Sequence, residues 1–487
     1  MQRRVEFLPV KSKKQRNQEK RLRKNILSAE ANKKNLKDTL KPKTTAKPPA
    51  KKQDGIKESL LQRVFGTKNP PATAQHSIPY REMYRDGICR VNNKLFNKTI
   101  TFGDINYQLA MNEDKTQIFE GWCSFLNYFD STISIQLSFV NQHGNKTVFD
   151  SAIDIPERDD EYNSIRVEYT DMLKNQLSKG NNGLIKKKYI TFGIEATSLR
   201  EAKPKLERIE SDIIGNFKTL GVTTQVLNGM ERLEVLHGIF HPDGKDKMLF
   251  SWKHLAESGM NTKDFIAPTS FDFRTNNVFR MGTTYGAVSY IQIIAPELSD
   301  KMLTDFLDMD NAIVVNLHIR SIDQAEAIKT IKRKITELDA MKINEQKKAV
   351  RSGYDIDVIP TDIATYGEEA KNILKELQSR NERMFVATII IMSTADTKRK
   401  PENHCFAAAG VAQKYNCALK RLDFQQEQGL ISSLPIGFNQ VEIERGLTTS
   451  STAIFVVIDL FWEDVCHPKI SSGYALCGTF GRIVKLP

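Results

Sequence analysis

Cysteine, long apolar runs and glycine-rich loops are scarce or missing in this sequence of 487 residues. The six Cys include no CxxC pair, which argues against a disulfide scaffold and against a zinc site. The only early apolar cluster, VEFLPV, is too short for the apolar core of a signal peptide. No stretch provides the roughly 20 apolar residues that a membrane-spanning helix needs. These absences predict a soluble, cytoplasmic protein.

The sequence also lacks a phosphate-binding loop of the form GxxxxGK[ST], whose backbone amides hold phosphates and whose hydroxyl holds Mg²⁺. Its only Gly-Lys pair, Gly244 with Lys245, is followed by Asp246. The apolar run that ends at Asp459 imitates a strand that carries a Mg²⁺-binding Asp, but an ordinary core strand explains it better. No catalytic, cofactor-binding or metal-binding residue is therefore predicted, and neither ATP nor Mg²⁺ is expected to bind to this chain.

Three short combinations have the residue types of a zinc or nucleophile site: His237 with His241, Cys405 with His404, and Cys466 with His467. The two His of HGIFHPDG are spaced like zinc ligands on one helix face, but Gly and Pro interrupt the helix and no Glu follows the first His. Adjacent Cys and His rarely point in the directions that catalysis needs, and most such Cys are simply buried. A helix end and buried thiols are the preferred interpretations.

Positive charge is concentrated at the start of the chain. Residues 1–60 hold 19 Lys and Arg against 6 Asp and Glu, whereas the rest of the chain holds 52 against 53. A segment with so little to bury is expected to be a disordered basic tail, over residues 1–75. It could be a solubilising arm, or it could bind an anionic membrane or DNA through charge. Few aromatic residues are interleaved, which argues against base stacking.

The run MFVATIIIM, residues 384–392, is apolar at every position except Thr388. A strand with one solvated face would alternate, so this pattern predicts a central strand with both faces buried, as in an α/β domain. Asp396 or Thr397 is expected to cap the helix that follows, with Pro401 in its first turn. Asn416 should end that helix before a strand over 417–422.

Other patterns also alternate between strands and helices. Asn92 and Asn93 mark a hairpin turn, alternation over 132–140 predicts a half-buried strand, and Ser198 with Glu201 predicts a capping box. Further helices are predicted at 104–130, 161–178, 198–220, 322–350 and 361–383, and further strands at 189–195, 285–295 and 312–319. The order predicts a mixed α+β and α/β fold with ferredoxin-like units. The predicted domains are 76–249 and 250–456, followed by an atypical tail, 457–487.

Several long blocks carry a resemblance to a known family. The longest are CALKRLDFQQEQGLISSLPIGFNQ at 417–440 and GLTTSSTAIFV at 446–456, with FLDMDNAIVVNLHI, KKAVRSGYD, DFIAPTSF, KPKLERIE and DINYQLAMNEDK before them. Over about residues 80–456 the chain resembles the large conjugation ATPases of type IV secretion. These are of the TrbE/CagE/TraC type, the fourth VirB component, in the form found on conjugative elements of Gram-positive bacteria.

The resemblance implies the docking portion of a motor ATPase at the inner face of the cytoplasmic membrane. The partners it implies are the type IV secretion channel, its coupling components and further copies of the chain. The relatives hold ATP and Mg²⁺ in a motor domain that follows the block ending at Val456, where this chain departs from the family pattern. We therefore expect a truncated form, inactive as an ATPase alone, whose residues 458–487 are not a native element of the family. A stand-alone adaptor that binds nucleic acid or anionic membrane is the alternative.

Overall fold

The computed structural model of the chain describes residues 73–103, 112–143, 162–180, 184–244, 246–294, 299, 301–352, 361–379, 382–454, 474–477 and 482–485. The predicted basic tail lies almost entirely outside these residues. The strands of the main sheet are β1 Glu82–Met83, β2 Cys89–Arg90, β3 Leu95–Phe102, β4 Ile133–His143, β5 Leu184–Glu195, β6 Thr224–Val226, β7 Phe271–Asp272, β8 Phe279–Met281, β9 Thr284–Ile293, β10 Ile313–Ser321, β11 Met384–Ala395, β12 Cys417–Arg421 and β13 Arg445–Thr448. The helices are α3 Ala74–Ser77, α4 Asn112–Tyr128, α6 Asn163–Gly180, α7 Leu199–Thr219, α8 Gly229–Phe240, α9 Trp252–Ser258, α10 Lys301–Leu307, α11 Gln324–Arg351, α12 Thr361–Ser379, α13 Arg399–Lys414, α14 Gln426–Ser432 and α15 Thr449–Ile454, with a 3₁₀ turn η1 at Thr262–Phe265.

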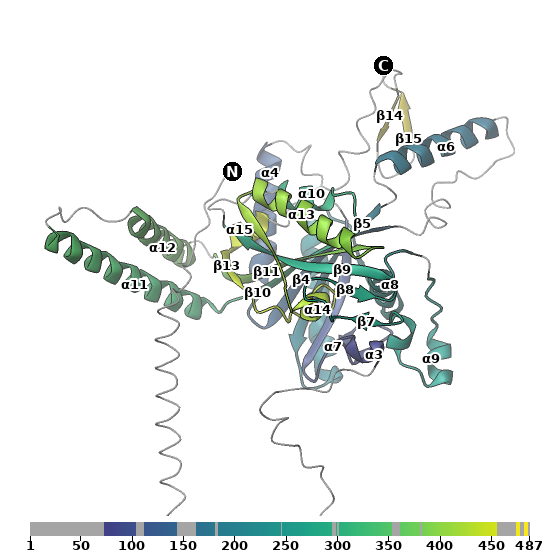
Figure 1. Cartoon of the computed structure of the whole chain (residues 1–487), viewed down its shortest axis with the longest axis horizontal. Coiled ribbons are helices and arrows are strands. Elements are labelled where there is room, and N and C mark those ends of the chain that lie inside the picture. The colour runs from purple at the N-terminus through teal and green to yellow at the C-terminus, as the bar shows by residue number, and fades with distance from the viewer. Residues whose placement is uncertain are drawn as a thin grey trace, which may run out of the picture. The chain divides into compact units, whose positions relative to one another are not determined.

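One sheet of 13 strands forms the centre of the protein (Figure 1). Its order is β1-β2-β3-β5-β4-β10-β11-β9-β8-β7, with β6 also paired to β3, β12 to β9 and β13 to β11. All strand pairs among the described residues are antiparallel. The mixed α+β class is therefore confirmed, while the parallel pairing of an α/β fold is not found in the described part of the chain.

The sheet contains the same arrangement twice. The first repeat runs along the chain as β3-α4-β4-α6-β5-α7-β6, and its strands lie in the sheet in the order β4-β5-β3-β6. The second repeat runs as β9-α10-β10-α11-α12-β11-α13-β12, and its strands lie in the equivalent order β10-β11-β9-β12. Each repeat thus has helices inserted between its second and third strands, α6 in the first and α11 with α12 in the second.

The two repeats join through their second strands. β4 and β10 pair antiparallel with Leu137 opposite Leu317, so equivalent positions of the two repeats meet at the junction. The ranges 76–249 and 250–456, expected as separate domains, consequently share one continuous sheet. The boundary near residue 250 separates two repeats, and the described residues all belong to one compact unit.

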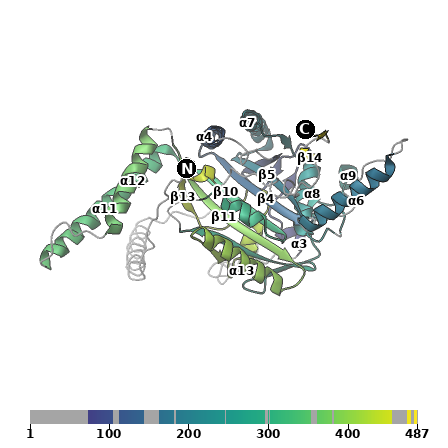
Figure 2. The same cartoon turned by 90° about the horizontal axis from the view of Figure 1, so that it is seen from above.

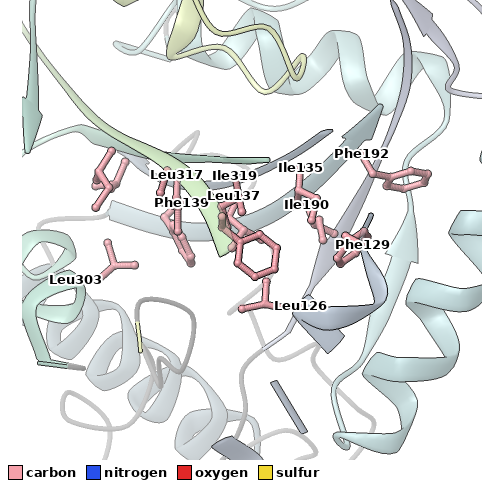
Figure 3. Packing of buried hydrophobic residues seen from close by; sticks show 14 of the residues in the cluster. Leu126, Phe129, Ile135, Leu137, Phe139, Ile190, Phe192, Leu303, Leu317 and Ile319 are labelled. Carbon is pink, nitrogen blue, oxygen red and sulfur yellow. The ribbon is translucent and has the colours of Figure 1, made fainter. Parts of the chain in front are cut away.

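A row of apolar side chains crosses one face of this sheet at matching register. From strand to strand it contains Val226, Ile100, Ile190, Leu137, Leu317 and Ile389, and Ile291 and Leu419 continue it on β9 and β12. Helices α4, α7, α10, α13 and α15 cover this face and join the same hydrophobic cluster, part of which is shown in Figure 3. Helical spacing of Ile118, Trp122, Phe125, Leu126 and Phe129 predicts one apolar face here. On α4 this face is confirmed, because Trp122, Phe125 and Leu126 are fully buried and Ile118 is half-buried, and Phe129 is buried just beyond the helix end.

Local sequence signals explain most of the observed helix and turn boundaries. Asn92 accepts two backbone hydrogen bonds in the predicted hairpin turn, and Ser198 caps α7 by accepting the amide of Glu201. Asn416 ends α13 with a positive φ of 51°, as expected. The predicted cap of α13 is wrong, since its N-cap is Lys398, which makes no side-chain cap. Asp396 instead pairs with Lys400, although Pro401 does lie in the first turn.

The last 31 residues contain one described feature. Strands β14, Tyr474–Cys477, and β15, Arg482–Lys485, pair as an antiparallel hairpin in a sheet of their own. The sequence past Trp462 has no clear helical or strand period, yet these two strands lie there, while the rest of 455–487 lies outside the described residues.

The apolar row predicts where the sheet is most sensitive to truncation. Leu137→Ala and Leu317→Ala each remove a buried side chain at the junction, and each should lower the free energy of unfolding by about 2–5 kcal/mol. Leu249→Ala is the matched control, because Leu249 is 83% exposed and should change stability by less than about 0.5 kcal/mol. Chemical denaturation of the three variants measures this, and a junction variant as stable as the control would contradict the packing described.

Candidate functional site: a buried polar row that holds an extended segment

Polar side chains form a second row on the opposite face of the sheet. Register places Thr99 beside Thr191, Thr191 beside Gln136, Gln136 beside His318, and His318 beside Thr388. All five are buried, and three further buried polar residues flank them: Asn97, Ser138 and Asn316. We call these eight residues the polar row. Since unpaired polar groups are costly to bury, each needs a hydrogen-bonding partner.

For five of the eight, the partner is an irregular segment that lies across both repeats. Residues 432–437, with the sequence SSLPIG, begin at the last residue of α14 and contribute no strand to the sheet. Ser432, Ser433, Leu434 and Ile436 are 0–1% exposed, so the segment is as buried as the core. We call residues 432–437 the covering segment. The sequence Leu434-Pro435-Ile436-Gly437 predicts a turn, and the turn is present, because the Ile436 amide donates to the Leu434 carbonyl and Gly437 has φ 64°.

The second repeat binds the start of the covering segment. His318 Nε2 lies 2.7 Å from the Ser432 carbonyl oxygen, and Asn316 Nδ2 donates to the Ser433 carbonyl at 2.9 Å. Ser138 of the first repeat donates to Asn316 Oδ1 at 2.6 Å, which fixes the orientation of the amide. The two repeats are therefore linked by side chains as well as by the pairing of β4 with β10.

Gln136 is the central residue of the polar row. Its Nε2 donates to the Leu434 carbonyl at 2.9 Å and to Asn316 Oδ1 at 2.7 Å, and its Oε1 accepts the Gly437 amide at 2.6 Å. One side chain of β4 thus satisfies a carbonyl and an amide of the covering segment, and it also contacts the second repeat.

The first repeat binds the end of the covering segment. Thr191 Oγ1 donates to the Pro435 carbonyl at 3.2 Å, and Asn97 Nδ2 donates to the Ile436 carbonyl. Carbonyls of five consecutive residues, from 432 to 436, are therefore each bonded by a different side chain of the polar row. The arrangement recognises backbone rather than side chains, as a sheet edge does when it binds a peptide, but it does so from a sheet face.

Arg232 of α8 also binds the end of the covering segment. Its guanidinium donates to the Gly87 carbonyl at 2.8 Å, to the Asn97 carbonyl and side-chain oxygen at 3.2 and 2.8 Å, and to the Pro435 carbonyl at 3.5 Å. Arg232 is 3% exposed, and burial lowers the pKa of its guanidinium. Its fork of donors meets only uncharged oxygens, so its role is to hold backbone and Asn97 in place.

His318 is the ionisable group of the row. Burial lowers the pKa of its imidazole to about 4, and the hydrogen bond to the Ser432 carbonyl opposes this shift. The ring is consequently neutral at pH 7, with the proton on Nε2 directed at that carbonyl. The ring thus serves as a buried hydrogen-bond donor to the backbone of the covering segment, which is a structural role.

The site joins several strands, so the periodicity of any single strand does not reveal it. Alternation over 132–140 predicts a half-buried strand, and this prediction is wrong: β4 is buried on both faces, since Gln136 is bonded to residues 434 and 437 and Ser138 to Asn316. A usable signal was present: Asn316 and His318 interrupt the otherwise apolar AIVVNLHI, and Thr388 is the one polar residue of MFVATIIIM. A polar residue on a strand that is otherwise buried on both faces indicates a dedicated partner.

The candidate histidine pair forms no metal site among the described residues. The rings of His237 and His241 stack with centroids 4.1 Å apart at the end of α8, and His241 Nδ1 lies 3.1 Å from the His237 carbonyl oxygen. Burial lowers the pKa of His237 to about 4. A search of the described residues finds no group of three or more His, Cys, Asp or Glu that could hold a metal ion.

Of the candidate thiols, Cys405 lies within the described residues, and its surroundings do not activate it. Cys405 Sγ lies 3.5 Å from Ser289 Oγ, and burial raises the pKa of the thiol, which opposes formation of the reactive thiolate. Asp459, Cys466 and His467 lie outside the described residues.

The polar row predicts that its central amide is essential for stability. Gln136→Met keeps the side-chain length but leaves the Leu434 carbonyl and the Gly437 amide without partners. We expect the free energy of unfolding to fall by about 2–5 kcal/mol, because each buried group left unpaired costs about 1–3 kcal/mol. Hydrogen exchange of residues 433–438 should also accelerate. Gln292→Met, at an exposed position on β9, is the control, and equal stability of the two variants would contradict the role of Gln136.

His318 predicts a loss of stability in mild acid. The unfolded chain binds a proton near pH 6.5 and the folded chain only near pH 4, so the unfolded state binds more protons between these values. Stability is therefore retained above pH 6.5 and lost as the pH falls toward 4, by about 2 kcal/mol between pH 7 and pH 5. His318→Gln keeps a donor for Ser432 and cannot titrate, so its loss over this range should be smaller by that amount. Denaturation at pH 7 and pH 5 measures it, and an unchanged slope would count against a neutral His318.

Comparison with models of known protein families gives no match for this chain, and a search of curated proteins gives none either.

Proposed function

We propose that this chain is the docking portion of a type IV secretion motor ATPase, built from two ferredoxin-like repeats that act as one rigid platform. The proposal assigns it to the conjugative TrbE/CagE/TraC type and places it at the inner face of the cytoplasmic membrane. Its partners would be the secretion channel, the coupling components and further copies of the chain. ATP and Mg²⁺ belong to the motor domain of relatives.

One observation carries the proposal: the block with the strongest family resemblance is also the block that locks the repeats together. Residues 417–440 supply β12, α14 and the covering segment, and residues 446–454 supply most of β13 and all of α15. In this proposal the most recognisable sequence of the family serves to hold the two repeats rigid. A rigid platform can transmit force from the motor without moving internally.

The end of this block is anchored at the junction of the repeats. Thr449 Oγ1 donates to Asn127 Oδ1 of α4 at 2.7 Å, and Ser450 Oγ donates to Glu382 Oε1 at 2.7 Å. The Thr449 amide donates to the Arg383 carbonyl, beside the start of β11. In the resembling family a motor follows this position, so the anchor supports a mechanical connection between motor and platform.

No helix in the described part of the chain is long and apolar enough to cross a membrane. Recruitment to a membrane would then depend on protein partners or on lipid head groups. Recruitment by protein partners requires the channel proteins, whereas recruitment by lipid head groups does not. Cell fractionation with and without the channel proteins therefore separates the two.

The test is to express the full chain with and without the inner-membrane channel proteins of a Gram-positive conjugative element. We expect the chain to remain in the membrane fraction after a high-salt wash only when these proteins are present, and we expect it to co-purify with them. As a matched control, the same cells should carry channel proteins from an unrelated secretion system, which should not recruit the chain. Salt-sensitive DNA binding without any channel protein, and no co-purification, would favour the stand-alone adaptor and overturn the proposal.

A further inference from the structure

Helices α11 and α12 form an arm that extends away from the sheet, on the left of Figures 1 and 2. The two helices pack against each other. At the base of the arm, Gln324 Nε2 donates to the Leu377 carbonyl at 2.8 Å. The buried residues of α11, Ala327 and Ile331, both lie in its first turns. The rest of α11 is covered by the described chain only on the side that faces α12.

The distal segment of α11, residues 340–351, combines apolar exposure with positive charge. Met341, Ile343 and Val350 are 43%, 49% and 53% exposed, respectively. The basic residues of the segment are Lys342, Lys347, Lys348 and Arg351, and its one acidic residue, Glu345, pairs with Lys348. Three exposed cations thus remain beside three exposed apolar side chains.

Helical spacing places the two kinds of residue on one stripe. Ile343, Lys347 and Val350 are separated by four and three residues, so they lie above one another on the helix surface. Lys329 and Lys332, both exposed, lie on the same side nearer the base of the arm. At 1.5 Å per residue the distal segment presents this stripe over roughly 17 Å.

We propose that the distal segment of α11 binds an anionic lipid surface. Lysine and arginine side chains gain affinity from acidic head groups, and apolar side chains between them enter the boundary of the acyl chains. Nucleic acid fits the stripe less well, because phosphate contacts would leave Ile343 and Val350 uncovered and α11 contains no aromatic side chain for base stacking.

Helix α6 provides an internal comparison. It occupies the equivalent insertion in the first repeat and extends on the right of Figures 1 and 2. Ile165 and Val167 are 58% and 51% exposed, but α6 carries three cations against two carboxylates, a net charge of +1, whereas α11 carries eight against four, a net charge of +4. If exposed apolar side chains were sufficient for lipid binding, α6 would bind as well as α11. If charge is also required, only α11 binds.

The test uses hydrogen exchange of the full chain with phosphatidylglycerol vesicles and with neutral phosphatidylcholine vesicles. Hydrogen exchange assigns protection to peptides, so contacts of the basic tail do not obscure those of the arm. We expect protection of peptides that contain the distal segment, residues 340–351, with phosphatidylglycerol vesicles only, and no protection of α6 with either. Protection of both helices on neutral vesicles, no protection of the distal segment, or the same protection by duplex DNA would each overturn the proposal.

Two pairs of substitutions separate charge from apolar insertion. Lys347→Gln with Arg351→Gln should raise the lipid concentration needed for half-maximal protection about fivefold for each charge removed. The control, Lys218→Gln with Lys253→Gln, removes two exposed charges from other helices and should leave protection of the arm unchanged.

Ile343→Ser with Val350→Ser should weaken protection even at high salt, whereas Leu249→Ser with Ile294→Ser should not. All eight positions are exposed, so unchanged unfolding midpoints are expected, and equal effects of test and control pairs would contradict the assignment.

This lipid contact is separable from the docking function proposed above. Loss of lipid binding with retained co-purification of channel proteins would remove the lipid site alone. Loss of co-purification with retained protection of the distal segment would remove the docking function alone.

Discussion

The hydrogen bonds between five consecutive carbonyls of residues 432–436 and the polar row are the constraint on which the rest of the structure depends. Neither the polar row nor the covering segment could be buried without the other. Side chains such as Gln136 and Asn316 would be left unpaired in the middle of a sheet, and the covering segment has no strand partner for its backbone. Because an unpaired buried group costs about 1–3 kcal/mol, the two sets stabilise each other or not at all.

The same contacts explain why two repeats behave as one body. Antiparallel pairing of β4 with β10 aligns the repeats, but strand pairing alone would leave the polar side chains exposed at the junction. The covering segment begins on His318 in the second repeat and ends on Asn97 in the first, so it spans the junction on one face. On the other face, Leu137 and Leu317 meet beneath α4 and α10 (Figure 3). The junction is thereby fixed from both sides, by polar contacts on one face and by apolar packing on the other.

Local features of the fold could be predicted from the sequence, and relations between distant segments could not. Periodicity identified the strand that contains Phe385 and the stripe of α4 that contains Trp122, because burial on one or two faces leaves a direct pattern. The repeat remained hidden because α6 and the longer α11 with α12 interrupt equivalent positions with unlike sequences. The candidate site remained hidden for a related reason, since Gln136 and the Leu434 carbonyl are 298 residues apart and neither has a local signature. The family resemblance expected from the sequence singles out residues 417–440 as distinctive, without indicating that they cover the sheet.

The position of the covering segment in the chain has a consequence for biosynthesis. The first repeat ends with β6 near residue 226, yet its polar row receives its partners only when residues 432–437 are available. Translation at about 5–20 residues per second separates these two events by on the order of 10–50 s. During that interval the nascent chain exposes a sheet face that it cannot yet close, and water must satisfy its polar side chains instead. The N-terminal half of this protein therefore cannot reach its final state on the ribosome ahead of the C-terminal half, and the last steps of folding must be shared by both.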